Sequence, residues 1–128
     1  MQRRRVSSGS PYEPLIGFSR AVRVGDRVIV SGTAPVGPDR QTVGVGDPAA
    51  QARRCFEIIV KALEDLGATA DDVVRTRTYL TNASDWEAVG RVHGEFFAKA
   101  MPASTMLVVK ELLDPTWLVE IEAEAVIG

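Results

Sequence analysis

The residues with the clearest chemical potential lie near the C-terminus, where acidic side chains alternate with apolar ones. Glu120, Glu122 and Glu124 are two residues apart, so in an extended strand all three lie on one face. Such a row is tolerated in solvent, but in a dry environment it needs cations or hydrogen-bond donors from a neighbour. Arg75 and Arg77 share the two-residue spacing and are the candidate partners. An ion-paired face and a fully solvated acidic face both remain open.

Metal and nucleophile chemistry have little support in the sequence. The chain contains one histidine, His93, and one cysteine, Cys55, so we expect no metal site and no cofactor. Cys55 falls near the apolar side of a predicted helix, which favours a buried hydrophobic role over a nucleophilic one. His93 lies on the inner side of a second predicted helix, where packing or capping is the usual role and general base catalysis is the alternative.

The catalogued loop motifs are also missing. Ser31-Gly32-Thr33 lacks the preceding glycine of a nucleophile elbow, and it does not enter a helix. No glycine-rich phosphate loop occurs anywhere in the chain.

The composition indicates a single domain that spans residues 1–128. The chain has 45% hydrophobic and 25% charged residues, the ordinary balance of a globular protein, which excludes disordered and low-complexity classes. A formal net charge of −2 gives no general attraction to phosphate, so a nucleic-acid partner is not favoured. We expect residues 1–16 to form an N-terminal segment that is partly mobile. Arg3, Arg4 and Arg5 within it are interpreted as a solvated, frayed end, with contact to an acidic partner as the alternative.

Two absences bear on where the protein acts. No apolar run approaches the roughly 20 residues that cross a bilayer, and no apolar segment follows the N-terminal arginines as it would in a secretory signal. A single cysteine cannot form an internal disulfide. We therefore expect a cytoplasmic protein without a membrane partner.

The first half of the chain predicts a hairpin followed by a helix. Residues 21–24 and 27–31 are apolar-rich runs on either side of Gly25-Asp26, which supplies turn chemistry. Residues 32–46 are rich in glycine and proline and predict a loop with one short edge strand at residues 41–43. Asp47 then provides an N-cap with proline after it, and a helical apolar stripe continues until Gly67.

The second half predicts three strands and a second helix. Alternation over residues 73–81 is typical of a strand, and Ser84 with Glu87 predicts a capping box for a helix that ends before Pro102. Residues 105–110 and 118–127 predict two further strands joined by a turn at Asp114-Pro115. Strands and helices do not strictly alternate, so the expected class is α+β: a mixed, mostly antiparallel sheet with two helices on one face.

Five short motifs follow one another along the chain: Val30-Ser31-Gly32-Thr33-Ala34-Pro35, Ala50-Gln51-Ala52, Thr76-Arg77-Thr78-Tyr79-Leu80, Met101-Pro102-Ala103 and Val119-Glu120-Ile121-Glu122-Ala123. Together, and in this order from about Gly17 onward, they resemble the Rid family, also called YjgF or endoribonuclease L-PSP. The resemblance implies a homotrimer with a chorismate-mutase-like α+β fold. In it the sheets close into a trimeric barrel, and three ligand clefts lie between subunits.

The resemblance also implies site residues. In the deaminating branch an arginine grips the substrate carboxylate, and Ser104 stands at that position here; a glutamate that handles a water and its proton matches Glu120. A family tyrosine aligns with Phe18. Trp86, Gly90 and Arg91 resemble a branch that commonly lacks the arginine. The expected catalytic residues are Glu120 and Ser104, and the expected ligand-binding residues are Phe18, Ser31, Gly32, Thr33, Tyr79, Gly90 and Arg91.

These residues define the expected function. Serine offers one neutral donor where a guanidinium offers two charge-assisted ones, so generic 2-imino acid deamination is expected to be weak unless Arg20, Arg77 or Arg91 supplies the cation. The leading interpretation is an imine or enamine deaminase-like hydrolase, or a binder, of a small polar metabolite that bears a carboxylate. The alternative is a non-catalytic ligand-binding trimer. The third hypothesis, endoribonuclease activity, rests on the family's older name.

Overall fold

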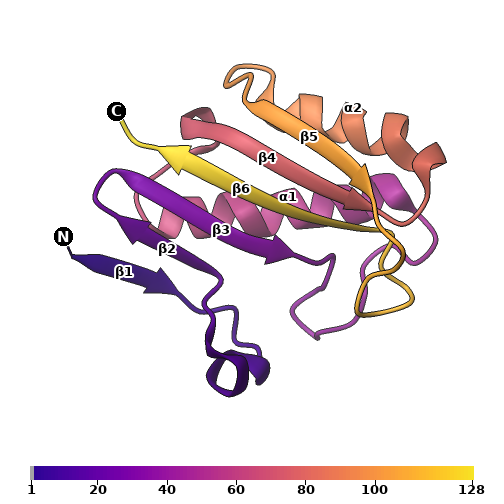
Figure 1. Cartoon of the computed structure of the whole chain (residues 1–128), viewed down its shortest axis with the longest axis horizontal. Helices are drawn as coiled ribbons and strands as arrows, with labels where there is room; N and C mark the ends of the chain where they lie inside the picture. Colours follow the sequence, from indigo (N-terminus) through magenta and orange to yellow (C-terminus); the bar gives the residue numbers. More distant parts are fainter. Residues whose placement is uncertain (1) are drawn as a thin grey trace.

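The computed structural model describes residues 2–128 and contains a six-stranded sheet with two long helices packed against one face (Figure 1). The strand order is β1-β2-β3-β6-β4-β5. The pairing of β4 with β5 is parallel and the other pairs are antiparallel, so the predicted mixed, mostly antiparallel α+β sheet is confirmed. The elements are β1 (Arg3–Val6), β2 (Ala21–Val24), β3 (Arg27–Thr33), α1 (Pro48–Asp65), β4 (Val73–Leu80), α2 (Trp86–Phe97), β5 (Ala103–Val108) and β6 (Val119–Val126), with short helical turns η1 (Glu13–Gly17), η2 (Ala70–Asp72) and η3 (Ala83–Asp85).

The predicted start and end of α1 are confirmed. The Asp47 carboxylate accepts a hydrogen bond from the Ala50 backbone N–H at 3.1 Å, and Pro48 opens the first turn. After the last turn, Gly67 has a φ of +86°, a left-handed conformation that glycine adopts without a steric cost. Phe56, Ile59 and Leu63 on the apolar stripe are fully buried against the sheet.

Several sequence predictions need correction. Arg3, Arg4 and Arg5 form β1 rather than a frayed end, because the free edge of β2 offers backbone hydrogen bonds that β1 satisfies. The Ser84 capping box is wrong: Ser84 lies inside η3, and α2 starts two residues later at Trp86. The expected strand at residues 41–43 is reduced to a single bridge between Val36 and Thr42. Strand bounds also differ, since β3 extends to Thr33 and β5 starts at Ala103.

A buried glutamine joins α1 to the segment that leads into β6. Gln51 is fully buried; its side-chain N–H₂ donates to the carbonyls of Gly44 and Thr116 at 3.2 and 2.9 Å. Its side-chain oxygen accepts from the Leu118 backbone N–H at 2.8 Å. The amide thereby fixes the backbone immediately before Val119 and Glu120. None of the helices in the described part of the chain is long and apolar enough to cross a membrane.

We expect Gln51→Leu to lower the free energy of unfolding by about 1 to 3 kcal/mol, because buried backbone groups of Gly44, Thr116 and Leu118 lose their partners. Urea unfolding followed by circular dichroism measures the change. The control is Glu64→Ala on the exposed side of α1, expected to stay within about 0.5 kcal/mol of the wild type. Equal stability of Gln51→Leu and the wild type would contradict this role.

Candidate active site

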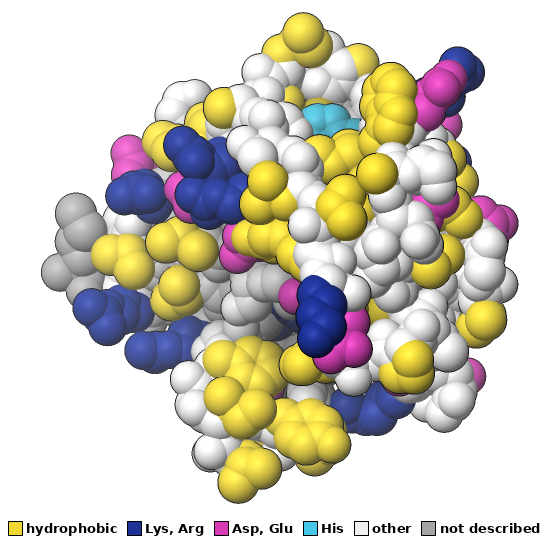
Figure 2. All heavy atoms as spheres, turned by 45° about the vertical axis from the view of Figure 1, so that its right-hand side comes forward, with side chains coloured by type: hydrophobic (Ala, Val, Ile, Leu, Met, Phe, Trp, Pro, Cys, Tyr) yellow, Lys and Arg dark blue, Asp and Glu magenta, His cyan; other side chains and the backbone are white. Residues whose placement is uncertain are grey.

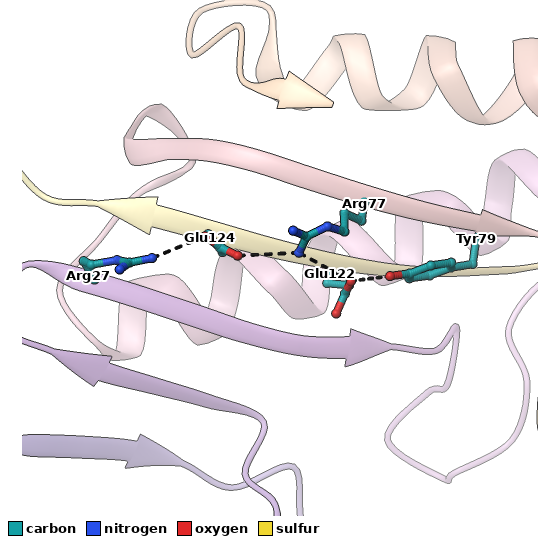
Figure 3. Close-up of polar contacts among 5 residues, drawn as sticks. All are labelled: Arg27, Arg77, Tyr79, Glu122 and Glu124. Atoms are coloured by element: carbon teal, nitrogen blue, oxygen red, sulfur yellow. Dashed lines mark hydrogen bonds and ion pairs between the residues drawn. The ribbon is translucent and has the colours of Figure 1, made fainter. Parts of the chain in front are cut away.

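The face of the sheet away from the helices carries the predicted acidic row, and it is ion-paired. Arg77 Nη1 lies 3.8 Å from Glu122 and 3.5 Å from Glu124, and Arg27 Nη2 lies 3.5 Å from Glu124 (Figure 3). The Tyr79 hydroxyl donates to Glu122. Of the two predicted partners, Arg77 is therefore the one engaged. These side chains are part-exposed, so the acidic row lies neither in a dry core nor on a fully solvated face. Each of its ion pairs therefore adds little to the stability of the fold.

Glu120 differs from the other two acids. Within residues 2–128 no ion pair joins it to a cation. Its Oε2 lies against Gly32, where a Cβ would be only 2.7 Å away. Burial raises the pKa of Glu120, the nearby charge of Arg20 opposes this, and the negative charge of Glu122 adds to it. A half-buried carboxyl with a raised pKa holds a proton more readily than an exposed one, which suits it to accept and return a proton.

Arg20 shapes the backbone beside Glu120. Its Nη2 donates to the carbonyls of Ser31 and Gly32, at 2.7 and 2.6 Å. The Ser31 hydroxyl donates to the Ser19 carbonyl at 2.7 Å, and the Thr33 hydroxyl donates to the Ser31 carbonyl at 2.8 Å. The pairing of β3 with β6 is irregular between Val30 and Thr33, so these contacts hold a bulge that brings Gly32 against Glu120.

The expected site residues fall into two groups, and the first gathers around Glu120. Gly32 contacts Glu120, Tyr79 is its register partner on β4, and Ser31 precedes Gly32. Phe18 lines the same groove as Ser31, while Thr33 is fully buried and serves to hold the bulge.

The second group lies on the helix side of the sheet. Ser104 is in register with Thr76 on β4, and Thr76 Oγ1 lies 2.9 Å from Ser104 Oγ and 2.8 Å from His93 Nε2. Gly90 and Arg91 lie on α2, and Arg91 Nη2 is 2.6 Å from Glu87. One chain therefore does not bring Ser104, Gly90 or Arg91 together with Glu120.

The sequence offered three arginines to replace the one missing at position 104, and the structure separates them. Arg91 is paired with Glu87, and Arg77 is paired with Glu122 and Glu124. Arg20 is the one beside Ser31, Gly32 and Glu120. Its role in holding the bulge was not predicted, because contacts to two carbonyls on another strand leave no pattern in the sequence.

His93 has a packing role on this second face. Its ring meets Phe56 edge-on at a centroid distance of 5.6 Å and lies 4.9 Å from the Phe97 ring. Burial lowers the pKa of His93, which favours the neutral imidazole, and its Nε2 is hydrogen-bonded to the Thr76 hydroxyl. The described residues contain no group of three His, Cys, Asp or Glu side chains that could hold a metal ion.

Comparison with known proteins identifies the family of this chain. The family model described as endoribonuclease L-PSP matches residues 9–127. The chain belongs to this family. The L-PSP family protein is 46% identical in sequence to Rv2704 of Mycobacterium tuberculosis, a member of the YjgF/YER057c/UK114 family. The crystal structure of Rv2704 superposes on this chain with a TM-score of 0.88, and the match covers 98% of this chain and 100% of Rv2704.

Two curated relatives extend the comparison. The uncharacterized protein SCO2049 of Streptomyces coelicolor is 45% identical over 98% of this chain and 92% of its own length. The 3-aminoacrylate deaminase RutC of Acinetobacter baylyi is 33% identical over 94% of each chain. The family membership predicted from the five motifs is confirmed.

We expect Gly32→Ala to lower the free energy of unfolding by up to about 1 kcal/mol, because the new methyl group would meet the Glu120 carboxylate and force this side chain to move. The matched control is Gly94→Ala on α2, where a Cβ meets no atom within 4 Å and the helix gains up to about 1 kcal/mol. Urea unfolding measures both. The close contact at Gly32 would be refuted if the two variants shifted stability equally.

The single histidine allows a direct test of its environment. We expect the His93 pKa to lie below the ordinary value of about 6.5. The unfolded chain then binds a proton that the folded chain does not, so stability falls as pH drops below about 6.5 and is regained above it. Proton NMR titration gives the pKa, and unfolding at a series of pH values gives the stability. His93→Phe should lose this pH dependence; stability that rises as pH falls from 7 to 6 would contradict the assignment.

Proposed function

We propose that the protein binds a small polar metabolite in clefts between the subunits of a homotrimer and hydrolyses an imine or enamine C–N bond there. Glu120 carries the proposal. It is part-buried, lacks a cation partner among residues 2–128, and has a raised pKa beside the Ser31–Gly32 bulge. The family membership and the 33% identity to a protein named 3-aminoacrylate deaminase support this reaction class.

Glu120 would act as the proton carrier. It takes a proton from water as the water oxygen bonds to the carbon of the protonated imine, which gives a carbinolamine. It then returns that proton to the amine nitrogen. The C–N bond breaks as the carbinolamine oxygen forms the carbonyl, the hydroxyl proton passes to the departing ammonia, and a keto product and an ammonium ion leave. Glu120 is regenerated, and water and the protonated imine are the only reactants.

Assembly into a trimer would explain the separation of the site residues. Because Ser104 and Glu120 lie on opposite faces of one sheet, a cleft that contains both requires them from different copies. The edge strand β5 also leaves Leu107 and Val108 about half exposed, at 49% and 56%. Apolar side chains on an unpaired strand favour contact with another chain.

A non-catalytic ligand-binding trimer is the second candidate, and it is favoured by Ser104 and Phe18, which replace an arginine and a tyrosine of the deaminating branch. Endoribonuclease activity rests on the name of the family and finds no support in a net charge of −2. We also propose the cytoplasm as the compartment, since Cys55 is free and buried.

The deciding experiment follows hydrolysis of 2-iminopropanoate, generated by an amino-acid oxidase and trapped with semicarbazide. We expect the wild type to be about two to three orders of magnitude slower than a relative with arginine at this position, because Ser104 cannot pair with the carboxylate. Ser104→Arg should recover part of the rate. Glu120→Gln should remove it, and Glu64→Gln on α1 should leave it unchanged.

Two outcomes would overturn this proposal. Decay at the rate without protein, in both the wild type and Ser104→Arg, would favour the non-catalytic alternative. Unchanged hydrolysis by Glu120→Gln would show that another group handles the water.

A further inference from the structure

A groove of about 300 Å³ adjoins the proposed site on the face of the sheet away from the helices. Phe18 and Ser31 line one end, Arg3 and Arg5 line the other, and Val22 and Ile29 form the apolar surface between them. None of the described residues that line it is acidic. Figure 2 shows Lys and Arg side chains beside hydrophobic ones at the left of the view, next to a hollow in the surface.

The strand register places two of the three N-terminal arginines in this groove. Arg3 and Arg5 pair with Val24 and Val22 of β2 and share one face of β1. Arg4 lies between them on the opposite face, where its Nη2 is 3.4 Å from the Asp65 carbonyl of α1. The side chains of Arg3 and Arg5 form no hydrogen bond or ion pair with another residue of the described chain.

Two unpaired guanidinium groups at one end of a groove, next to an apolar stretch formed by Val22 and Ile29, favour a ligand with an anionic end and a hydrocarbon chain. Their Cα atoms are about 7 Å apart, so both side chains can reach one carboxylate. The aliphatic surface of Val22 and Ile29 excludes water from a short hydrocarbon chain. We propose that Arg3 and Arg5 bind the carboxylate of an aliphatic ligand whose chain lies over Val22 and Ile29 and whose other end reaches Ser31.

Binding at Arg3 and Arg5 would define the substrate class of the proposed function. It rests on that function, because the ligand is assumed to occupy the cleft beside Ser31. Arg5 pairs with Val22 on β2, and Val22 pairs with Ile29 on β3, so Ile29 lies two strands away from Arg5 at the same level of the sheet. Ser31 is two residues further along β3. The Cα atoms of Arg5 and Ser31 are therefore roughly 12 Å apart. A three-carbon imino acid is too short to contact Arg5 while its reacting carbon lies at Glu120. The preferred ligand is longer, with its carboxylate remote from the reacting end.

The test is a titration of the ¹⁵N-labelled protein with hexanoate, compared with its neutral analogue hexanamide. We expect hexanoate to cause saturable shifts of the Phe18, Ser19 and Ser31 amide signals in the millimolar range. Arg3→Gln and Arg5→Gln should each weaken hexanoate binding about tenfold, the loss of one charge-assisted hydrogen bond. Hexanamide should bind at least about tenfold more weakly.

Arg4→Gln is the matched control, because it removes the same charge from the same strand on the opposite face. It should leave the dissociation constant within about twofold, since long-range charge effects are screened. Equal loss in Arg4→Gln and Arg5→Gln, equal binding of hexanamide, or the absence of saturable shifts at Phe18 and Ser31 would overturn the proposal. In the wild type, we expect added salt to weaken the binding of hexanoate but not that of hexanamide, because salt screens the attraction between the arginines and the carboxylate.

The outcome is independent of the imine assay. Arginine-dependent hexanoate binding without imine hydrolysis would retain the groove and refute the proposed reaction. Imine hydrolysis that depends on Glu120, with hexanoate binding unaffected by Arg5→Gln, would retain the reaction and refute the groove.

Discussion

The contact between the Glu120 carboxylate and the bare Cα of Gly32 is the constraint on which the site depends. A side chain at position 32 would come within 2.7 Å of the carboxylate oxygen, so the carboxyl group can occupy this position only beside glycine. Arg20 holds the adjoining backbone through two carbonyls, and Gln51 fixes the segment that enters β6. The result is a carboxyl group kept away from the cations that pair with Glu122 and Glu124. Its protonation is therefore governed mainly by burial.

The sheet divides the polar side chains into two sets with different surroundings. On the helix side, Ser104, Thr76 and His93 form a hydrogen-bonded row that ends among the aromatic rings of α1 and α2. On the open side, acids, arginines and Tyr79 form a part-exposed network. The alternation of side chains along each strand imposes this division, and residues two apart stay together. A ligand that meets both sets would have to lie between two copies of the chain, as in the proposed trimer.

Much of the fold follows from local sequence patterns. Period-two alternation predicted the core face of β6, and the Asp47-Pro48 cap with Gly67 predicted the limits of α1, because these signals depend on neighbouring residues alone. The parallel pairing of β4 with β5 and the added strand β1 were not predicted, since pairing partners distant in sequence leave no local pattern. The placement of Ser104 on the helix side follows from its register with Thr76, which only the assembled sheet determines. The same limit explains why the contacts of Arg20 and the groove at Arg3 and Arg5 emerged only from the structure.

Glu120 can act as a proton carrier because its surroundings raise the pKa of its carboxyl group, and titration of this carboxyl group tests the idea most directly. Carbon NMR of the side-chain carboxyl groups, assigned with Glu120→Gln, follows each glutamate as pH is varied. The account predicts that the Glu120 midpoint lies above the ordinary glutamate value of about 4.3, because burial outweighs the opposing charge of Arg20. A midpoint at or below that value would show that Arg20 dominates and holds Glu120 as a fixed anion, and it would contradict the account.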